Sequence, residues 1–169
     1  MLWLGLLSLP FALLFPPLLL VSLIFFLLAR KKDKEWKNRS FGVRFETKTI
    51  KTLTHNLPKD WTGKKDLPVP GHGNLDYLVY TNQGKYAIEI KSFTGLIKKG
   101  DYVEKTKGTP LKKDPIQQVI TTSRYYHANA ILWLPQAYAP PFFCRDVLVV
   151  QGTSKTLIKE IYKLEKVYA

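Results

Sequence analysis

The sequence predicts a mixed α/β domain, with one sheet flanked by helices and preceded by an N-terminal transmembrane helix. Two runs rich in β-branched and aromatic residues, 75–80 and 85–93, flank the turn sequence TNQG and predict an antiparallel hairpin. A third run, 146–151 (DVLVVQ), is largely apolar and typical of a buried strand. Stretches with helical spacing precede and follow these strands, so a chain of 169 residues indicates one α/β domain plus an anchor.

Residues 1–29 form the predicted anchor, because they contain no Asp, Glu, Lys, Arg or His. A helix of this length extends roughly 40 Å at about 1.5 Å per residue, which exceeds the roughly 30 Å of a hydrocarbon core. Pro10, Pro16 and Pro17 interrupt the pattern, and the adjacent pair is expected to kink or break the helix. We favour one kinked span with 18–29 as its regular half. The alternative turns back near Pro16 and would expose backbone groups to lipid.

The charges that follow the apolar segment predict its orientation. No basic residue precedes the segment, which argues against a cleaved signal peptide, whereas a basic cluster follows it: Arg30, Lys31, Lys32 and Lys34. The positive-inside rule therefore predicts a single-pass protein of the cell membrane whose domain faces the cytoplasm. Residues 30–40 would form a basic juxtamembrane linker, and its cations can contact anionic lipid headgroups for about 1 kcal/mol each.

The soluble part carries all of the charge. The chain has 26 Lys+Arg and 13 Asp+Glu, so the formal net charge of +13 belongs to residues 30–169. A domain this cationic attracts polyanions, namely nucleic acid or anionic lipid headgroups, although excess lysine also simply keeps small domains soluble. Cys144 is the only cysteine, which excludes a disulfide framework and a Cys-rich zinc site.

The predicted domain, 41–169, opens with an amphipathic helix over 41–57 that Pro58 ends. A loop rich in Lys, Pro and Gly then leads to the hairpin. Two further strands are expected beyond the hairpin, around 95–98 and 102–105.

A second core helix is expected to open at Asp114-Pro115, where a first turn accepts proline, and to extend to about Ala130. Prolines between 135 and 141 mark a loop before the strand 146–151. Thr153 or Ser154 then caps a closing helix. The expected order is helix, three or four strands, helix, strand, helix.

The hairpin carries the candidate site. If Tyr80 opposes Lys85 across the turn, Asp76 lies directly opposite Glu89, and strand alternation places Lys91 on the same face as Glu89. A register shifted by one residue would aim Asp76 at the other face, so the placement is a testable inference.

This cluster has a chemical logic. Two neighbouring carboxylates bind a hard divalent ion, Mg²⁺ or Mn²⁺, which lowers the pKa of a bound water and neutralises phosphodiester charge. A nearby ammonium holds the attacking water or the phosphate. The alternative is an ordinary solvated Glu–Lys pair. Polar residues inside the otherwise apolar stretch YAIEI favour a functional face.

The arrangement of Asp76, Glu89 and Lys91 resembles the PD-(D/E)XK nuclease superfamily, with Leu75 at the proline position. The longer stretch GNLDYLVY…GKYAIEIKSFTGLI is similar to the nuclease-related domain (NERD) family. Two flanking segments match in the right order: Gly42-Val43-Arg44-Phe45-Glu46 resembles the family's G-x-x-x-E, and Asp114-Pro115-Ile116-Gln117-Gln118 resembles its N-P-x-x-Q, with Asp for Asn. The resemblance covers about 41–130 and extends more loosely to the strand 146–151.

The resemblance implies a restriction-endonuclease-like fold. It assigns Asp76 and Glu89 as metal ligands, Lys91 as the catalytic lysine, and Glu46 and Gln118 as supporting polar residues. The function it implies is metal-dependent phosphodiester hydrolysis on DNA or RNA by a membrane-anchored domain, with Mg²⁺ or Mn²⁺ as cofactor. The alternative is a catalytically inactive nucleic-acid-binding or scaffold module at the cytoplasmic membrane surface.

Overall fold

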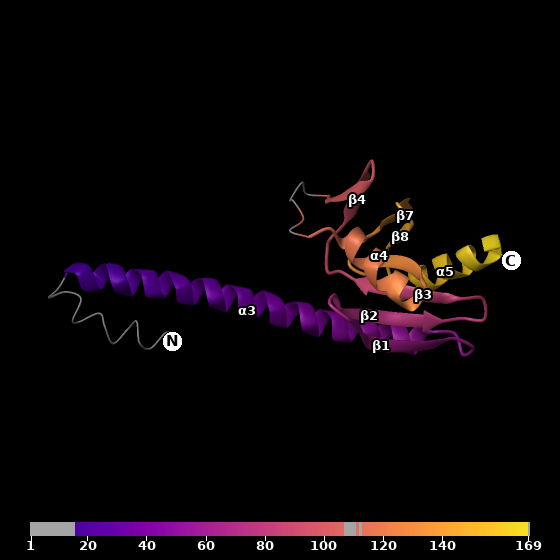
Figure 1. Cartoon of the computed structure of the whole chain (residues 1–169), viewed down its shortest axis with the longest axis horizontal. Coiled ribbons are helices and arrows are strands. Elements are labelled where there is room, and N and C mark those ends of the chain that lie inside the picture. Colours follow the sequence, from indigo (N-terminus) through magenta and orange to yellow (C-terminus); the bar gives the residue numbers. More distant parts are fainter. Residues whose placement is uncertain (1–15, 107–110, 112, 169) are drawn as a thin grey trace. The chain divides into compact units, whose positions relative to one another are not determined.

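The computed structural model describes residues 16–106, 111 and 113–168. The chain separates into two compact units, residues 1–44 and 45–169. The boundary lies inside the first described helix, α3 (Pro16–Asn56), which is 41 residues long (Figure 1). The second unit contains every other described element and all of the predicted site residues.

Helix α3 begins at Pro16, so the two adjacent prolines occupy its first turn, where their missing N–H groups are not needed. The charged stretch 30–40, which we expected to act as a linker, is itself helical and continuous with both neighbours. An ion pair of 2.9 Å between Lys37 and Asp33, one turn apart, stabilises it. The helix ends at Asn56, in agreement with a stop at Pro58.

The predicted membrane segment is described only in part, because its residues 1–15 lie outside the described residues. Its second half, from Pro16 to Ala29, is helical, as predicted for 18–29. In the described part of the chain, no helix combines the length and the apolar character needed to cross a membrane.

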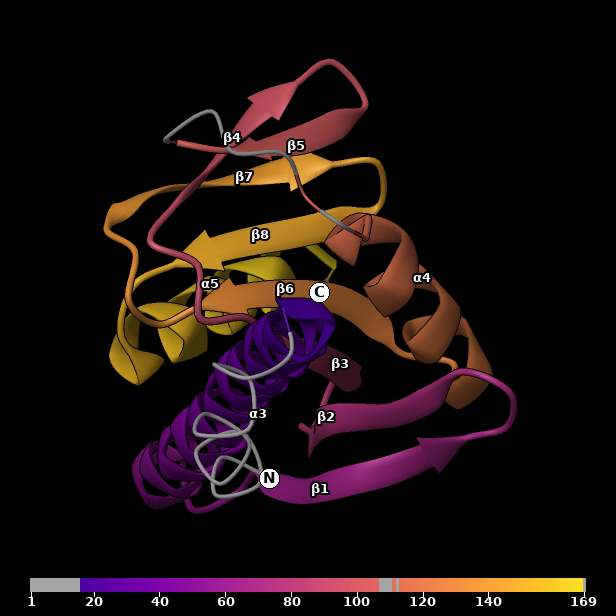
Figure 2. The same ribbon diagram turned by 90° about the vertical axis from the view of Figure 1, so that its left-hand side faces the viewer.

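The second unit is built around a six-stranded mixed sheet with the order β1-β2-β3-β6-β8-β7. Pairing is parallel for β3–β6 and β6–β8 and antiparallel for the other neighbours. A separate hairpin, β4–β5, lies beyond β7 in the view of Figure 2. The strands are β1 (Thr62–Val69), β2 (Gly73–Tyr80), β3 (Lys85–Ile90), β4 (Leu96–Lys99), β5 (Tyr102–Lys105), β6 (Asn129–Leu134), β7 (Ala139–Cys144) and β8 (Val147–Gln151).

Helices cover both faces of the sheet (Figure 2). On one face, Ile50 and Leu53 of α3 join residues of α5 (Ser154–Tyr168) in a buried cluster with Ile88 and Trp133. On the other face, α4 (Pro115–Tyr126) packs its apolar side against β6 and β8. Because helices cover both faces of the sheet, the sequences of the parallel strands are nearly continuous runs of apolar residues.

The end of α3 is attached to the sheet by a polar contact as well as by apolar packing. The hydroxyls of Thr54 and Tyr77 lie 2.9 Å apart. The Tyr77 ring passes across β1 at Gly63, where a Cβ would overlap the ring. The absence of a side chain at Gly63 therefore lets the tyrosine reach α3, and α3 carries Glu46.

Helix α4 starts and stops at identifiable caps. The Asp114 carboxylate accepts hydrogen bonds from the Ile116 and Gln117 N–H groups, and Pro115 occupies the first turn. The helix ends at Tyr126, earlier than the predicted Ala130, because His127 adopts a left-handed conformation with φ 50° and caps it. This early stop frees 129–134 to form β6.

Truncating Leu53 to alanine should destabilise the second unit by about 2–5 kcal/mol, because the side chain is fully buried against the sheet. Lys51→Ala, an exposed change on the same helix, should stay within about 0.5 kcal/mol of the wild type. Urea unfolding followed by tryptophan fluorescence measures both. Equal stability of the two variants would show that the end of α3 does not belong to the domain core.

Candidate active site

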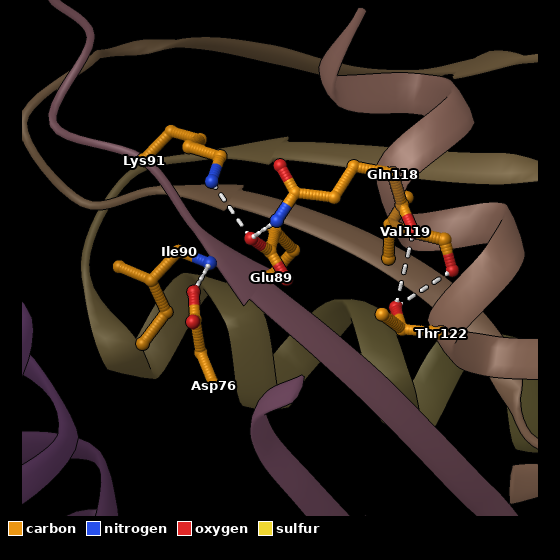
Figure 3. Close-up of polar contacts among 7 residues, drawn as sticks. All are labelled: Asp76, Glu89, Ile90, Lys91, Gln118, Val119 and Thr122. Carbon is orange, nitrogen blue, oxygen red and sulfur yellow. Dashed lines mark hydrogen bonds and ion pairs between the residues drawn. The ribbon is translucent and has the colours of Figure 1, made fainter. Parts of the chain in front are cut away.

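The site forms where β2 and β3 stop pairing. The register has Tyr80 opposite Lys85 and Tyr77 opposite Ile88, which confirms the predicted alignment. The next pair would be Asp76 and Glu89. Instead, the Asp76 carboxylate accepts a hydrogen bond from the Ile90 N–H at 2.7 Å (Figure 3). A side chain thus replaces the backbone acceptor, and both acids are held at the opening between the strands.

Glu89 is the most unusual residue of the site, because only 1 % of its surface is exposed. Its Oε1 accepts a hydrogen bond from the Gln118 amide and forms an ion pair of 2.7 Å with the Lys91 ammonium (Figure 3). Its Oε2 is also buried and has no hydrogen-bond partner. A buried carboxylate oxygen without a partner is costly, so it marks a place where a ligand would be favourable.

Lys91 and Gln118 are positioned by the sheet and by α4. The Lys91 N–H donates to the Trp133 carbonyl at 3.0 Å, which continues the β3–β6 pairing one residue past β3. Gln118 lies in the first turns of α4, on the side that faces Glu89 (Figure 3). The structure thus brings together four residues predicted from the sequence: Asp76, Glu89, Lys91 and Gln118.

Burial and mutual repulsion raise the pKa values of the acids. Burial, followed by the charge of Glu89, raises the pKa of Asp76 to about 7. Burial is also the main cause that raises the pKa of Glu89, against the opposing effect of Lys91. Ionising these acids together is therefore unfavourable with Lys91 as the compensating charge, and a bound cation would favour their ionised forms.

Glu46, the fifth predicted residue, reaches the same site from α3. Its pKa is raised to about 7, first by burial and then by the charges of Asp76 and Asp66, whereas Lys91 lowers it. No hydrogen bond joins Glu46 to the other acids, so it lies beside the cluster as an electrostatic neighbour.

Asp66 is a site neighbour that sequence reasoning missed. The β1–β2 register pairs Lys65 with Tyr77 and Leu67 with Leu75, so Asp66 falls opposite Asp76. Asp66 adopts a left-handed conformation with φ 51°, and the ladder skips this position. Its segment was expected to be a loop, so nothing in the sequence pointed to a cross-strand partner.

The family comparison fits this geometry. The family model described as nuclease-related domain (NERD) matches residues 41–150, which is well over half of the chain. The chain belongs to the NERD family. All five predicted site residues lie inside the matched range. Comparison with curated proteins and with solved structures gave no match.

The NERD family is nuclease-related, and nucleases often use divalent metals, so the donor set can be tested against such an ion. Within the described residues, no group of three or more His, Cys, Asp or Glu side chains could hold a metal. Asp76 and Glu89 offer two carboxylates, one of them with a buried oxygen lacking a partner. Mg²⁺ is commonly bound by one or two carboxylates, with waters and substrate phosphates completing its shell. The residues present therefore fit a site completed by substrate.

Without divalent ions, the stability of the domain should fall as pH rises from about 4 to about 7.5. The pKa values of Asp76 and Glu46 rise from 3.8 and 4.5 to about 7 on folding. The folded chain therefore binds more protons than the unfolded chain in this window, and deprotonation opposes folding.

Thermal melts in EDTA across this range measure the effect. Asp76→Asn should flatten the pH dependence, because an amide does not ionise. Asp146→Asn, an exposed change away from the site, should keep the wild-type profile. A melting temperature that rises steadily from acid to neutral pH would contradict the assignment.

Proposed function

We propose that this NERD chain hydrolyses phosphodiester bonds of DNA or RNA with the help of Mg²⁺ or Mn²⁺. The observation that carries the proposal is the buried Glu89 carboxylate. One of its oxygens is held by Lys91 and Gln118, and the other has no partner. An oxygen left without a partner beside a second acid suits a ligand that arrives from outside.

Each residue has a role in this proposal. Asp76 and Glu89 would hold the divalent ion, which supplies positive charge to the phosphate and acidifies a bound water. Lys91, fixed by Glu89, would place its ammonium against a phosphate oxygen as negative charge develops. Glu46, with its pKa of about 7, is matched to accept a proton near neutral pH. Gln118 would keep Glu89 in its orientation.

The charge of the chain supports nucleic acid as the substrate. The formal net charge of +13 attracts phosphate backbones, and the resulting counterion release makes such binding sensitive to salt. The alternative, a scaffold that binds nucleic acid without cutting it, predicts the same binding but no products. Cleavage therefore decides between the two.

Purified full-length chain should cleave single-stranded or plasmid nucleic acid with Mg²⁺ or Mn²⁺ and should stop when EDTA is added. Asp76→Ala and Lys91→Ala should each lower the cleavage rate at least about 100-fold, because each removes charge stabilisation of the transition state. Asp146→Ala and Lys159→Ala, exposed residues of the same types, serve as matched controls and should retain activity.

Two results would count against this proposal. Cleavage that persists in both site variants would place the chemistry elsewhere. Salt-sensitive binding with no products under either metal would favour the inactive module.

We also propose that residues 1–29 tether the domain to the cell membrane, with the domain in the cytoplasm. The described part of this segment has exposed apolar side chains around the helix, each 42–65 % exposed: Leu20, Val21, Leu23, Ile24, Phe25, Phe26, Leu27 and Leu28. A helix that is apolar on all sides needs an apolar environment. Arg30 lies over the Phe26 ring at 5.0 Å, so the basic cluster begins where the apolar surface ends.

Fractionation of cells tests the tether. The full-length chain should sediment with membranes and resist alkaline carbonate extraction, because a spanning helix is not released by charge effects. A chain that begins at residue 30 should move to the soluble fraction. A full-length chain found in the soluble fraction would refute the tether without affecting the cleavage proposal.

A further inference from the structure

The β4–β5 hairpin, residues 96–105, is a candidate binding element outside the site, and we call it the arm. Only residues 92–95 separate Lys91 of the site from the start of the arm. The side-chain amide of Gln151, at the end of β8, holds the arm in place. It accepts a hydrogen bond from the Leu96 N–H at 2.9 Å and donates one to the Leu96 carbonyl at 3.1 Å. The arm is thus fixed relative to the site rather than hanging from a free loop.

Packing determines which side of the arm is available. Leu96 and Val103 are buried in the same apolar cluster as the α4 side chains. Because side chains alternate along strands, the opposite side carries Ile97, Lys99, Tyr102 and Glu104. Ile97 is 39 % exposed and Tyr102 is 51 % exposed.

The base of the arm brings another cation toward the site. The Lys105 ammonium lies 5.0 Å from the centre of the Phe93 ring. Phe93 is two residues beyond Lys91, and its ring packs against the α4 cluster. The cation–π contact therefore holds the ammonium of Lys105 next to the segment that leaves the site.

The arm has the composition of a surface for unpaired nucleic acid. Such surfaces combine lysine or arginine for the phosphates with exposed aromatic rings on which bases stack. The arm offers Lys99 on the same side as the exposed ring of Tyr102, and it carries Lys98 and Lys105 on the other side. Lys99 and Glu104 are 3.6 Å apart and both partly exposed, and exposed pairs of this kind are weak, so Lys99 can exchange its partner for a phosphate.

We propose that the arm binds single-stranded nucleic acid and guides it to the Asp76–Glu89 site. Its lysines contact the phosphates, and Tyr102 stacks on a base. This inference rests on the proposed function, because it names the binding element of the same site. An anionic membrane is the other polyanion that a basic surface meets. The short, fixed connection from the arm to Lys91 favours the nucleic acid.

Fluorescence anisotropy of the full-length chain in mild detergent tests the arm without any need for cleavage. A labelled single strand of about 20 nucleotides, long enough for one binding site, is titrated in EDTA at several salt concentrations. Tyr102→Ala should weaken binding at least about fivefold, the effect of losing one stacked base. Replacing Lys98, Lys99 and Lys105 by glutamine should reduce the slope of log affinity against log salt by about 2, at about 0.7 per phosphate contact.

Matched controls lie elsewhere on the surface. Tyr138→Ala removes a tyrosine that is 82 % exposed, and glutamine at Lys155, Lys159 and Lys166 of α5 removes the same number of exposed charges. These controls should bind like the wild type. The same strand annealed to its complement should bind with little dependence on Tyr102, because its bases are already stacked.

Three results would overturn the inference. The arm variants could bind the single strand as tightly as the controls do. Tyr102→Ala could weaken binding of the duplex as much as binding of the single strand, or the arm variants could lose only their binding to anionic lipid vesicles.

Failure of the proposed function would be seen in a different measurement, the formation of cleavage products. If the wild type yields no products but the arm variants still lose single-strand binding, the cleavage proposal is contradicted and the proposal for the arm is supported. If the wild type cuts and the arm variants cut and bind normally, the proposal for the arm is contradicted and the cleavage proposal is supported.

Discussion

The rest of this structure depends on the point where β2 separates from β3. At Tyr77 and Ile88 the backbone ladder is still intact, and one residue later the Asp76 carboxylate takes over as acceptor for the Ile90 N–H. A buried N–H must be paired, so the strands can separate only because an acidic side chain is available at that position. The separation creates the opening in which Glu89 lies beside Asp76. One hydrogen bond thus satisfies the backbone and positions the first acid of the site.

The burial of Glu89 links this opening to the topology of the sheet. A buried carboxylate is tolerated when cationic and polar groups face it, and here the groups are Lys91 from the same strand and Gln118 from α4. Helix α4 is the crossover that connects the hairpin to the parallel partner β6, so it must lie over β3. The parallel pairing therefore brings Gln118 to Glu89. Within the site, Oε2 of Glu89 is left without a hydrogen-bond partner from the described residues.

The strands that were predicted and those that were missed differ in where they lie in the sheet. β2, β3 and β8 are inner strands, and their apolar or aromatic composition reflects burial on both faces. β1 and β7 are the two edges. β1 is mostly exposed and so lacks an alternating pattern, and β7 contains two prolines, which an edge strand tolerates. β6 was missed because its start was assigned to the preceding helix, which ends early at the left-handed His127.

By itself, the sequence determined the inner hairpin, its register and the start of α4, and it predicted five site residues, because these depend on alternation, turn composition and short motifs. Those signals involve residues close together in the chain, so they can be recognised without knowledge of the tertiary structure. Only the tertiary structure decided that Oε2 of Glu89 lacks a partner, that Asp66 of β1 lies opposite Asp76 of β2, and that Gln151 holds the arm against the sheet. Each of these facts joins residues that are distant in the chain, so they exist only once the strands have been ordered and the burial of each side chain is settled.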